Sequence, residues 1–213
     1  MKPIVTVIDY GIGNLYSVKR ALEICGADVV FASNPEQVYA ANHLVLPGVG
    51  AFASGMAGLR DRGLIDVIRA HAADKKPLMG ICLGMQMFFS VSEEFGEHEG
   101  LDLVPGRVRS LPKFSADGEA QKIPRIGWAG LCKTPDMDWT QTPLSGLSDG
   151  EAVYLVHSFA AEPTFAFHQL AFTWFGGRSV CTVVRCGSII GCQFHPEKSG
   201  PVGLKILQNF LVQ

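Results

Sequence analysis

Residues 77–86 read PLMGICLGMQ, an apolar run that passes through Gly-x-Cys-x-Gly into a second apolar run. The pattern predicts a buried strand, a sharp turn at Cys82 and an apolar helix, because flanking glycines permit a backbone turn that a Cβ atom would obstruct. The Gly-x-Ser-x-Gly elbow of serine hydrolases presents its serine in the same way. A thiol at a helix N-terminus lies where the helix dipole favours the attacking thiolate. We therefore interpret Cys82 as a nucleophile, with a buried small apolar side chain as the alternative.

Short apolar runs alternate with helix-like patterns through the first half of the chain. They cover residues 4–8, 15–25, 28–31, 44–46, 64–71, 78–81 and 85–89. This alternation is typical of βαβ units on a parallel sheet with helices on both faces. Ligands of such sheets bind beyond the carboxyl ends of the strands. The glycine-rich turns 9–14 and 47–50 follow strand-like runs, as Cys82 does, so we expect all three at one edge of the sheet.

The second half of the chain, from Gly106 onward, consists of shorter strand-like pieces between Pro, Gly and Asp clusters. It ends in one amphipathic pattern, which predicts a helix over residues 202–211. We expect these strands to add an antiparallel part to the parallel sheet. The predicted fold class is α/β, a mixed and mostly parallel central sheet flanked by helices, in a single domain over residues 1–213. The polar stretch 112–121 is predicted to be a mobile surface loop.

The length, composition and net charge limit the classes of protein to which the chain can belong. A chain of 213 residues with 47% hydrophobic residues is long enough for one well-packed core. Its net charge of −2, without a long run of Lys or Arg, argues against a nucleic-acid partner and against a basic membrane-binding surface. The N-terminus lacks the pattern of a secretory leader, and no apolar run is long enough to span a bilayer. We expect a soluble, cytoplasmic protein.

The six cysteines show no Cys-x-x-Cys pair and lie mostly within apolar stretches. Neither a disulfide framework nor a zinc site is therefore indicated, and we expect reduced thiols. Cys181, Cys186 and Cys192 lie near His195 in the sequence, but cysteines within strands usually belong to the core. We expect no metal and no cofactor.

A cysteine nucleophile needs a base and a group that orients the base. Residues 191–197 read GCQFHPE at the end of an apolar run. Pro196 favours extended geometry at His195, and side chains two residues apart in an extended segment point the same way. Glu197 can then hold one ring nitrogen of His195 while the other nitrogen faces Cys82. Among the remaining histidines, His157 is the rival base.

The anionic oxygen of a tetrahedral intermediate needs N–H donors. The backbone N–H of Leu83, directly after the nucleophile, is one candidate donor. The turn over residues 47–50, PGVG, is the other, because its glycines let the backbone approach a substrate closely. The alternative for this turn is an ordinary tight connection between a strand and a helix.

Residues 80–86 together with His195, Pro196 and Glu197 resemble the class I, or triad, glutamine amidotransferases. Residues 7–18, 46–52, 154–159 and 191–199 resemble, more narrowly, the glutaminase subunits of imidazole glycerol phosphate synthases in histidine biosynthesis. The resemblance extends from Val5 to the terminal helix. It implies a flavodoxin-like fold with a mixed sheet and flanking helices, as expected above from the alternation.

The resemblance also implies roles for individual residues. Cys82 would be the nucleophile, His195 the general base and acid, and Glu197 the residue that orients His195. Glutamine would be held by Gly48, Gln86 and the backbone around His157 and Ser158, with Val49 and Leu83 as the oxyanion donors. Family members form a heterodimer with a (β/α)₈-barrel cyclase that receives the ammonia. The side chains expected near that partner are Asn14, Tyr16, Trp128 and Lys198.

One segment departs from the family pattern Pro-His-x-Gly-Trp-Asn. This chain has Arg125 and Ala129 where the family has His and Asn. The departure leaves open a paralogous subunit that supplies ammonia to another barrel synthase, such as one that amidates surface sugars. The rival enzyme classes are a stand-alone Cys-dependent peptidase and a γ-glutamyl hydrolase, and the non-enzymatic alternative is a redox-sensing or chaperone-like α/β protein. Because uncoupled hydrolysis wastes glutamine, we also expect the 47–50 turn to become competent only with the partner.

Overall fold

The computed structural model describes residues 2–213, and its centre is an eight-stranded sheet. The strand order is β2-β1-β3-β4-β14-β13-β12-β9. These strands are Ile4–Ile8 (β1), Asp28–Ala32 (β2), His43–Leu46 (β3), Leu78–Ile81 (β4), Cys132–Lys133 (β9), Gln169–Phe175 (β12), Arg178–Cys186 (β13) and Ile189–Cys192 (β14). Strands β2, β1, β3, β4 and β14 are parallel, and β13, β12 and β9 continue the sheet in antiparallel pairing. The predicted mixed, mostly parallel sheet is confirmed.

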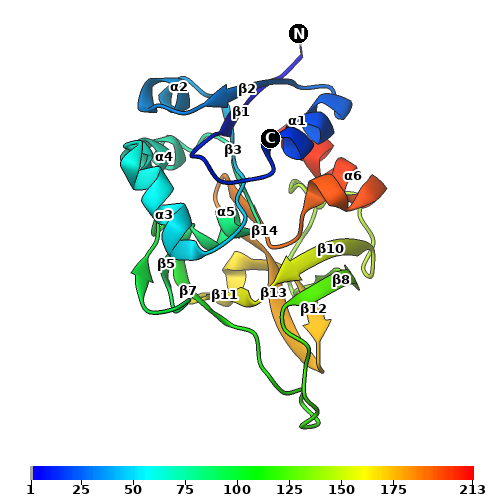
Figure 1. Cartoon of the computed structure of the whole chain (residues 1–213). Helices are drawn as coiled ribbons and strands as arrows, with labels where there is room; N and C mark the ends of the chain where they lie inside the picture. Colours follow the sequence, from blue (N-terminus) through cyan, green and yellow to red (C-terminus); the bar gives the residue numbers. More distant parts are fainter. Residues whose placement is uncertain (1) are drawn as a thin grey trace.

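Helices cover both faces of the parallel part. They are Leu15–Ile24 (α1), Pro35–Tyr39 (α2), Phe52–Asp61 (α3), Leu64–Ala73 (α4), Leu83–Gln86 (α5) and Gly200–Phe210 (α6), with single 3₁₀ turns at Ala166–His168 (η1) and Pro196–Lys198 (η2). Side chains that alternate along β3 point to opposite faces of the sheet, so the core consists of two clusters. Leu44 and Leu46 pack in the cluster with α3 and α4, and Val45 packs in the cluster with α1 and α6. Figure 1 shows α3 and α4 on one side of the sheet and α1 and α6 on the other.

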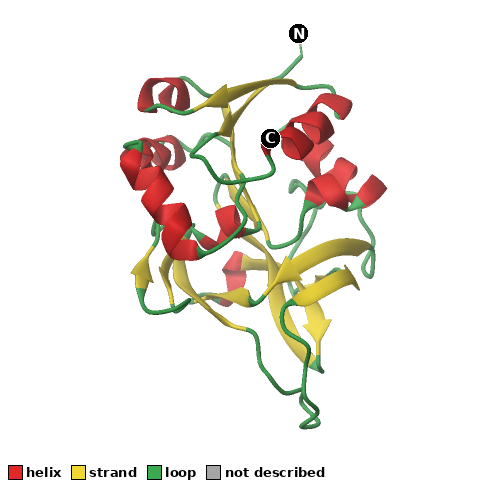
Figure 2. Cartoon of the chain, in the orientation of Figure 1, coloured by secondary structure: helices red, strands yellow, loops and turns green. Residues whose placement is uncertain are grey.

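Two smaller sheets complete the second half of the fold. A four-stranded sheet has the order β11-β7-β5-β6, and a two-stranded sheet pairs β10 with β8. Their strands are Phe89–Ser92 (β5), His98–Glu99 (β6), Val104–Ser110 (β7), Arg125–Gly130 (β8), Ala152–His157 (β10) and Phe159–Pro163 (β11). Figure 2 shows most helices in one half of the molecule and mainly strands and loops in the other.

The local assignments differ from the sequence predictions in the first half. The helix predicted over residues 85–89 is wrong: α5 ends at Gln86, and Phe89 opens β5, which pairs with β7. The helices α2 and α3 were not anticipated. The terminal helix is confirmed, since α6 covers Gly200–Phe210. Residues 112–121 form a projecting hairpin-like loop with a bridge between Phe114 and Ala120 (Figure 1), and its mobility stays a prediction.

Several features outside the sheet bear on the composition-based expectations. Within residues 2–213, no helix has the length and apolarity needed to cross a membrane. All six cysteines are free thiols. The part of the chain that the structure describes contains no group of three His, Cys, Asp or Glu side chains arranged to hold a metal ion. Cys181 and Cys192 are core residues, and burial raises the pKa of both thiols.

Candidate active site

Cys82 lies at a strained elbow between β4 and α5. Its backbone has φ 54° and ψ −109°, a left-handed conformation that side chains other than glycine rarely adopt. The turn also brings the chain against the end of β3, because a Cβ atom on Gly84 would collide with the carbonyl oxygen of Leu46. The thiol is 8% exposed. The predicted elbow is therefore present, with the sulfur at the base of a cavity described below.

The helix that follows the elbow is a single turn. Only Leu83–Gln86 are helical, so α5 has four residues where a longer helix was predicted. A helix dipole depends on several aligned peptide units, and one turn contributes little of it. Stabilisation of a Cys82 thiolate therefore has to come from neighbouring side chains.

The pairing of β14 with β4 brings His195 to the sulfur. Cys192 lies beside Ile81 in parallel register, and the Cys82 N–H donates to the Cys192 carbonyl oxygen at 2.7 Å. The chain beyond β14 therefore runs alongside the elbow. The His195 N–H donates to the Tyr154 carbonyl oxygen at 3.0 Å, which also fixes the segment to β10. His195 and Cys82 thus meet although they are far apart in sequence.

The His195 imidazole is hydrogen-bonded to Glu197 through Nδ1. Its Nδ1 lies 2.8 Å from Glu197 Oε1, and the side chains of His195 and Glu197 are 7% and 1% exposed. Burial alone lowers the pKa of His195, but the hydrogen bonds and negative charges of Cys82 and Glu197 outweigh burial and raise its pKa to about 10. The arrangement favours the imidazolium form of His195.

The rival histidine, His157, has a different environment at the end of β10. Its Nδ1 lies 2.9 Å from the Phe159 carbonyl oxygen, and its buried Nε2 has no partner in residues 2–213. Burial lowers its pKa to about 4, and the positive charges of Arg125 and His195 act in the same direction. His157 is therefore neutral at physiological pH, and no carboxylate orients it.

Gln193 contacts Cys82 and was not predicted from the sequence. Its Nε2 lies 3.7 Å from Cys82 Sγ, within donor distance for sulfur. Gln86 Nε2 donates to Gln193 Oε1 at 3.0 Å and to the Phe159 carbonyl oxygen at 3.0 Å, which orients both amides. Gln193 is fully buried. The available signal was its spacing, because Gln193 precedes His195 by two residues at a strand end.

A cavity of about 320 Å³ opens over the sulfur. Its lining consists of Val49, Gly50, Cys82, Leu83, Gln86, Glu94, Pro124, Val156, His157, Ser158, Phe159, His195 and Lys198. Most of the predicted catalytic, oxyanion and substrate residues are thus brought together here. Gly48 and Glu197 lie behind this surface, with Glu197 supporting His195 from within.

The turn over residues 47–50 forms one wall of the cavity. The Tyr10 hydroxyl donates to the Pro47 carbonyl oxygen at 2.9 Å, and a Cβ atom on Gly48 would approach that hydroxyl to 2.5 Å. Burial and the Cys82 charge raise the pKa of Tyr10, which keeps the hydroxyl as a donor. Within residues 2–213, the N–H groups of Val49 and Leu83 make no backbone hydrogen bond. Neither N–H group is used within the described backbone, as the predicted role of oxyanion donor requires.

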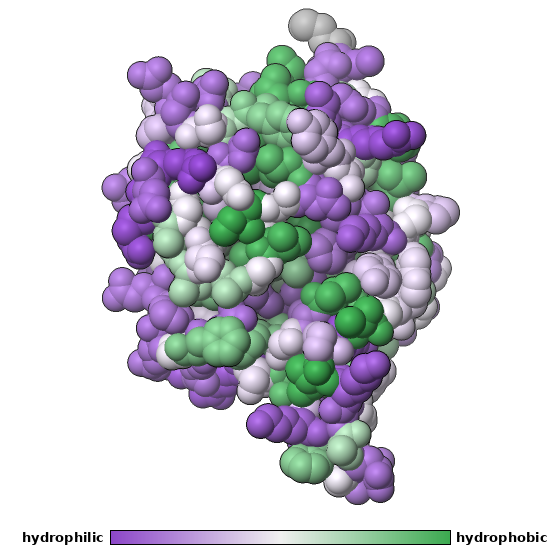
Figure 3. Space-filling view, in the orientation of Figure 1, coloured by the Kyte–Doolittle hydropathy of each residue, from purple (hydrophilic) through white to green (hydrophobic). Residues whose placement is uncertain are grey.

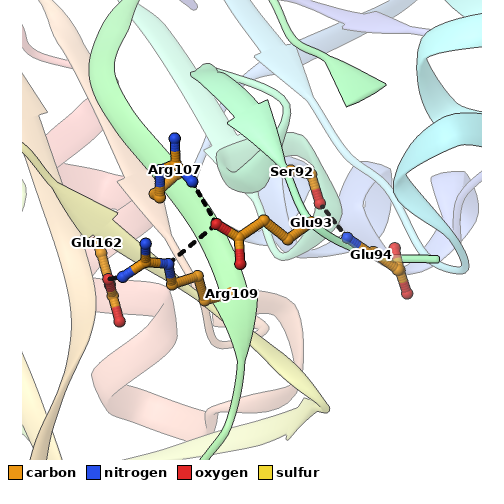
Figure 4. Close-up of polar contacts among 6 residues, drawn as sticks. All are labelled: Ser92, Glu93, Glu94, Arg107, Arg109 and Glu162. Carbon is orange, nitrogen blue, oxygen red and sulfur yellow. Dashed lines mark hydrogen bonds and ion pairs between the residues drawn. The ribbon is translucent and has the colours of Figure 1, made fainter. Parts of the chain in front are cut away.

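Glu94 is a second residue that sequence reasoning missed. It is the one carboxylate on the cavity surface over the described residues, and its Oε2 accepts the Phe52 N–H at 2.6 Å. Its neighbour Glu93 points the other way and accepts from Arg107 and Arg109, while Arg109 also pairs with Glu162 at 3.0 Å (Figure 4). No sequence motif marked Glu94, because its position depends on how β5 ends.

The departure from the family pattern lies on the inner side of β8. Arg125 is 9% exposed and donates to Thr173 Oγ1 at 2.7 Å and to the Trp174 carbonyl oxygen at 3.0 Å. Ala129 packs against the core cluster with α1 and α6. The exposed side of β8 instead carries Ile126 and Trp128. The two replaced residues therefore do not alter the outward face of this strand.

The residues expected at a partner surface are all exposed. Trp128 is 59% exposed and packs edge-on against Tyr154, and Tyr16 is 80% exposed at the start of α1. Asn14 precedes α1, and Lys198 lies at the cavity mouth. Figure 3 shows hydrophobic side chains on this face, including the region of β8 and β10, among charged side chains.

Comparison with known proteins gives consistent results. The sequence model of the class-I glutamine amidotransferase family matches residues 6–213. The imidazole glycerol phosphate synthase subunit HisH 1 of Legionella pneumophila (strain Paris) is 49% identical over 97% of this chain and 98% of its own. The HisH subunit of Syntrophotalea carbinolica is 42% identical over 97% of this chain and 98% of its own. The structure of PurLQS from Thermotoga maritima matches the fold, with a TM-score of 0.74 at 20% identity, over 100% of this chain and 99% of that one.

Proposed function

The chain belongs to the class-I glutamine amidotransferase family, and from this premise we propose that it is the glutaminase subunit of an imidazole glycerol phosphate synthase. It hydrolyses glutamine to glutamate and ammonia for histidine biosynthesis. The whole chain, residues 1–213, serves as one amidotransferase domain, which acts in the cytoplasm. The relatives named above support the histidine pathway over a paralogous synthase.

One observation supports the chemistry most strongly. His195 and Cys82 line the same cavity, and His195 Nδ1 lies 2.8 Å from Glu197 Oε1 behind the cavity surface. This is the nucleophile, base and orienting group that acyl transfer through cysteine requires. We assign Cys82 as the nucleophile, His195 as the general acid and base, and Glu197 as the residue that orients His195.

The first half-reaction forms a thioester. The thiolate of Cys82 attacks the side-chain amide carbon of glutamine, and the oxygen that becomes negative is bound by the N–H groups of Val49 and Leu83. The protonated His195 then gives its proton to the amide nitrogen, so that the carbon–nitrogen bond breaks and ammonia leaves. Glu197 keeps the ring in the orientation that directs this proton.

The second half-reaction consumes water. The now neutral His195 takes a proton from a water molecule, and the resulting hydroxide attacks the thioester carbon. The carbon–sulfur bond breaks, glutamate is released, and Cys82 returns to the thiolate beside a protonated His195. The same oxyanion donors serve both halves of the reaction.

The cavity offers groups that match the other end of glutamine. Free glutamine carries an α-ammonium group, and Glu94 supplies the carboxylate that would bind it. Gln86 uses its amide nitrogen within the protein, so it offers glutamine its side-chain oxygen. Gly48 allows the backbone to approach closely, and the backbone at His157 and Ser158 lines the opposite wall.

The proposed partner is a (β/α)₈-barrel cyclase in a heterodimer, because ammonia released into water at neutral pH is protonated and lost as a nucleophile. The exposed aromatic ring of Trp128 suits an interface anchor. Asn14, Tyr16 and Lys198 are the further side chains that we assign to this interface. The glycines of the 47–50 turn allow its backbone to change conformation, and we propose that the turn reaches its active geometry when the partner binds its own substrate.

Co-expression with a barrel cyclase tests this function. The complex should use glutamine as the nitrogen source, and Cys82→Ser should abolish glutamine-dependent turnover but spare turnover with added ammonium salt. A complex that uses ammonium salt alone, with wild-type Cys82, would refute the glutaminase assignment. Release of glutamate from γ-glutamyl peptides without a partner would instead identify a stand-alone hydrolase.

A further inference from the structure

Glu94 contacts two parts of the molecule that the mechanism uses separately. It faces the cavity, and its Oε2 accepts the Phe52 N–H at 2.6 Å. Phe52 is the first residue of α3, and the candidate oxyanion donor Val49 lies three residues before it. The Glu94 carboxylate therefore accepts a hydrogen bond from the backbone immediately after the oxyanion turn.

The N-terminus of α3 depends on this contact. Ala51 occupies the N-cap position with extended backbone and provides no side-chain hydrogen bond to the helix. Glu94 thus acts as a cap from a distant part of the chain, and its negative charge lies where the dipole of a ten-residue helix favours it. Phe52 itself is fully buried, so the cap and the core hold the same end of α3.

The second carboxylate oxygen remains available to a ligand. Over residues 2–213, Glu94 Oε1 makes no hydrogen bond, and it is not among the buried polar atoms that lack partners. Figure 4 shows that Glu94 turns away from the Glu93, Arg107 and Arg109 network, so those charges do not compete for it. The Glu94 N–H donates to Ser92 Oγ at 3.2 Å, and Ser92 is fully buried, which fixes the segment from which Glu94 projects.

We propose that Glu94, which binds the substrate amine in the proposed function, is also a positioning residue for the oxyanion turn. One oxygen holds the start of α3, and with it the turn that carries Val49, while the other binds the α-ammonium group. The proposal rests on the proposed glutaminase function. It links occupancy of the amine site to the geometry of the oxyanion donors through a single carboxylate.

Two substitutions separate these roles. Glu94→Gln keeps an oxygen that can accept the Phe52 N–H but removes the charge that attracts the ammonium group. Glu94→Ala removes both. In the complex with the cyclase, Glu94→Gln should raise the KM for glutamine by about tenfold or more and leave kcat within about threefold. Glu94→Ala should raise the KM similarly and also lower kcat by about tenfold or more, because an oxyanion donor moves.

A substrate without the amine isolates the positioning role. Glutaramate has the side-chain amide and the carboxylate of glutamine but no α-amino group. With glutaramate, Glu94→Gln should match the wild type, whereas Glu94→Ala should still lose kcat. Alkylation of Cys82 by iodoacetamide forms no oxyanion, so its rate should be unchanged in both variants, which also shows that the site is folded. Glu93→Gln, one residue away and outside the cavity, is the matched control and should leave both constants within about threefold.

The outcomes distinguish this inference from the function on which it rests. Equal kcat values for Glu94→Ala and Glu94→Gln, with both substrates, would overturn the positioning role while leaving glutaminase activity intact. Loss of iodoacetamide reactivity in Glu94→Ala, with a normal rate in Glu94→Gln, would also overturn it by showing a collapsed site. A wild-type complex that does not hydrolyse glutamine would refute the proposed function itself.

Discussion

Two histidines at the ends of different strands line the same cavity, and they differ in whether a carboxylate lies beside the ring. The chain beyond β14 carries His195 with Glu197 2.8 Å from its ring nitrogen, whereas β10 ends in His157, which has only a carbonyl oxygen beside it. Both rings are buried. The pKa of His195 is raised to about 10, and the pKa of His157 is lowered to about 4.

The contrast supports the proposal that His195 is the catalytic base and that His157 belongs to the cavity wall. Burial disfavours the charged ring in both places. At His195, burial lowers the pKa, but the hydrogen bonds and charges of Cys82 and Glu197 raise it by more. At His157, burial lowers the pKa, and the positive charges of Arg125 and His195 lower it further. A ring with a pKa of about 4 is almost entirely neutral at pH 7 and is a weak general base there. We therefore infer different roles for two histidines that line the same cavity.

The largest expected effect comes from replacing each histidine by asparagine. His195→Asn should lower glutamine-dependent kcat by about 10³-fold, because both proton transfers depend on this ring. His157→Asn should lower it by less than about tenfold, since His157 contributes to the wall of the site. Steady-state kinetics of the two complexes, with ammonium-dependent turnover as the control, make the comparison. Similar losses in both variants would remove the distinction.

The next effect isolates the carboxylate. Glu197→Gln keeps the shape of the side chain but removes its charge, so the pKa of His195 should fall and the ring should lose its fixed orientation. We expect kcat to fall by about 10²-fold. An NMR titration of His195 should show the lower pKa directly. If the turnover and the titration of His195 both matched the wild type, Glu197 would affect neither the pKa nor the orientation of His195.

A third effect concerns stability in acid. The folded-state pKa of His157 is about 4 against 6.5 when unperturbed, so between these values the unfolded chain binds more protons at this site. The free energy of unfolding should therefore fall as pH falls from 6.5 towards 4, with His157 contributing a loss of about 2 kcal/mol by about pH 5. In His157→Asn this part of the pH dependence should be absent. Denaturant unfolding of both proteins across this range measures it, and parallel curves would contradict the burial of a neutral ring.

The smallest effect tests the contact between the Gln193 side chain and the sulfur of Cys82. Gln193→Leu removes the N–H that faces Cys82 Sγ at 3.7 Å, and we expect kcat to fall by about tenfold or less because the sulfur loses a hydrogen-bond donor. Steady-state kinetics of the complex with glutamine measure the effect. Gln193→Glu keeps an acceptor for Gln86 but removes the donor, so kcat should fall in this variant as well. A wild-type kcat in both variants would show that this contact does not contribute to turnover.

The site could be predicted because its residues lie in short sequence patterns that keep the predicted local geometry in the structure. The role of Cys82 was predicted from its flanking glycines, and that of Glu197 from its spacing to His195. Their meeting follows from the parallel pairing of β14 with β4, whose carboxyl ends lie at one edge of the sheet.

Other features depended on tertiary contacts that a local pattern does not contain. The apolar run after the elbow reads equally well as helix or strand, and Phe89 becomes a strand residue because β5 pairs with β7. The helix α3 contains Gly55 and Gly58, which weaken a helical pattern, although they pack closely against Leu83 and Tyr10. Gln193 and Glu94 gain their roles from residues distant in the sequence, so their type alone did not mark them.

The most direct test of the central assignment is covalent labelling of the complex with an electrophilic glutamine analogue, followed by peptide mapping. We expect a single modification, on Cys82, that forms at the wild-type rate in His157→Asn and about 10²-fold or more slowly in His195→Asn. Labelling of a different residue, or equal rates in the two histidine variants, would contradict the assignment of Cys82, His195 and Glu197 as the catalytic group.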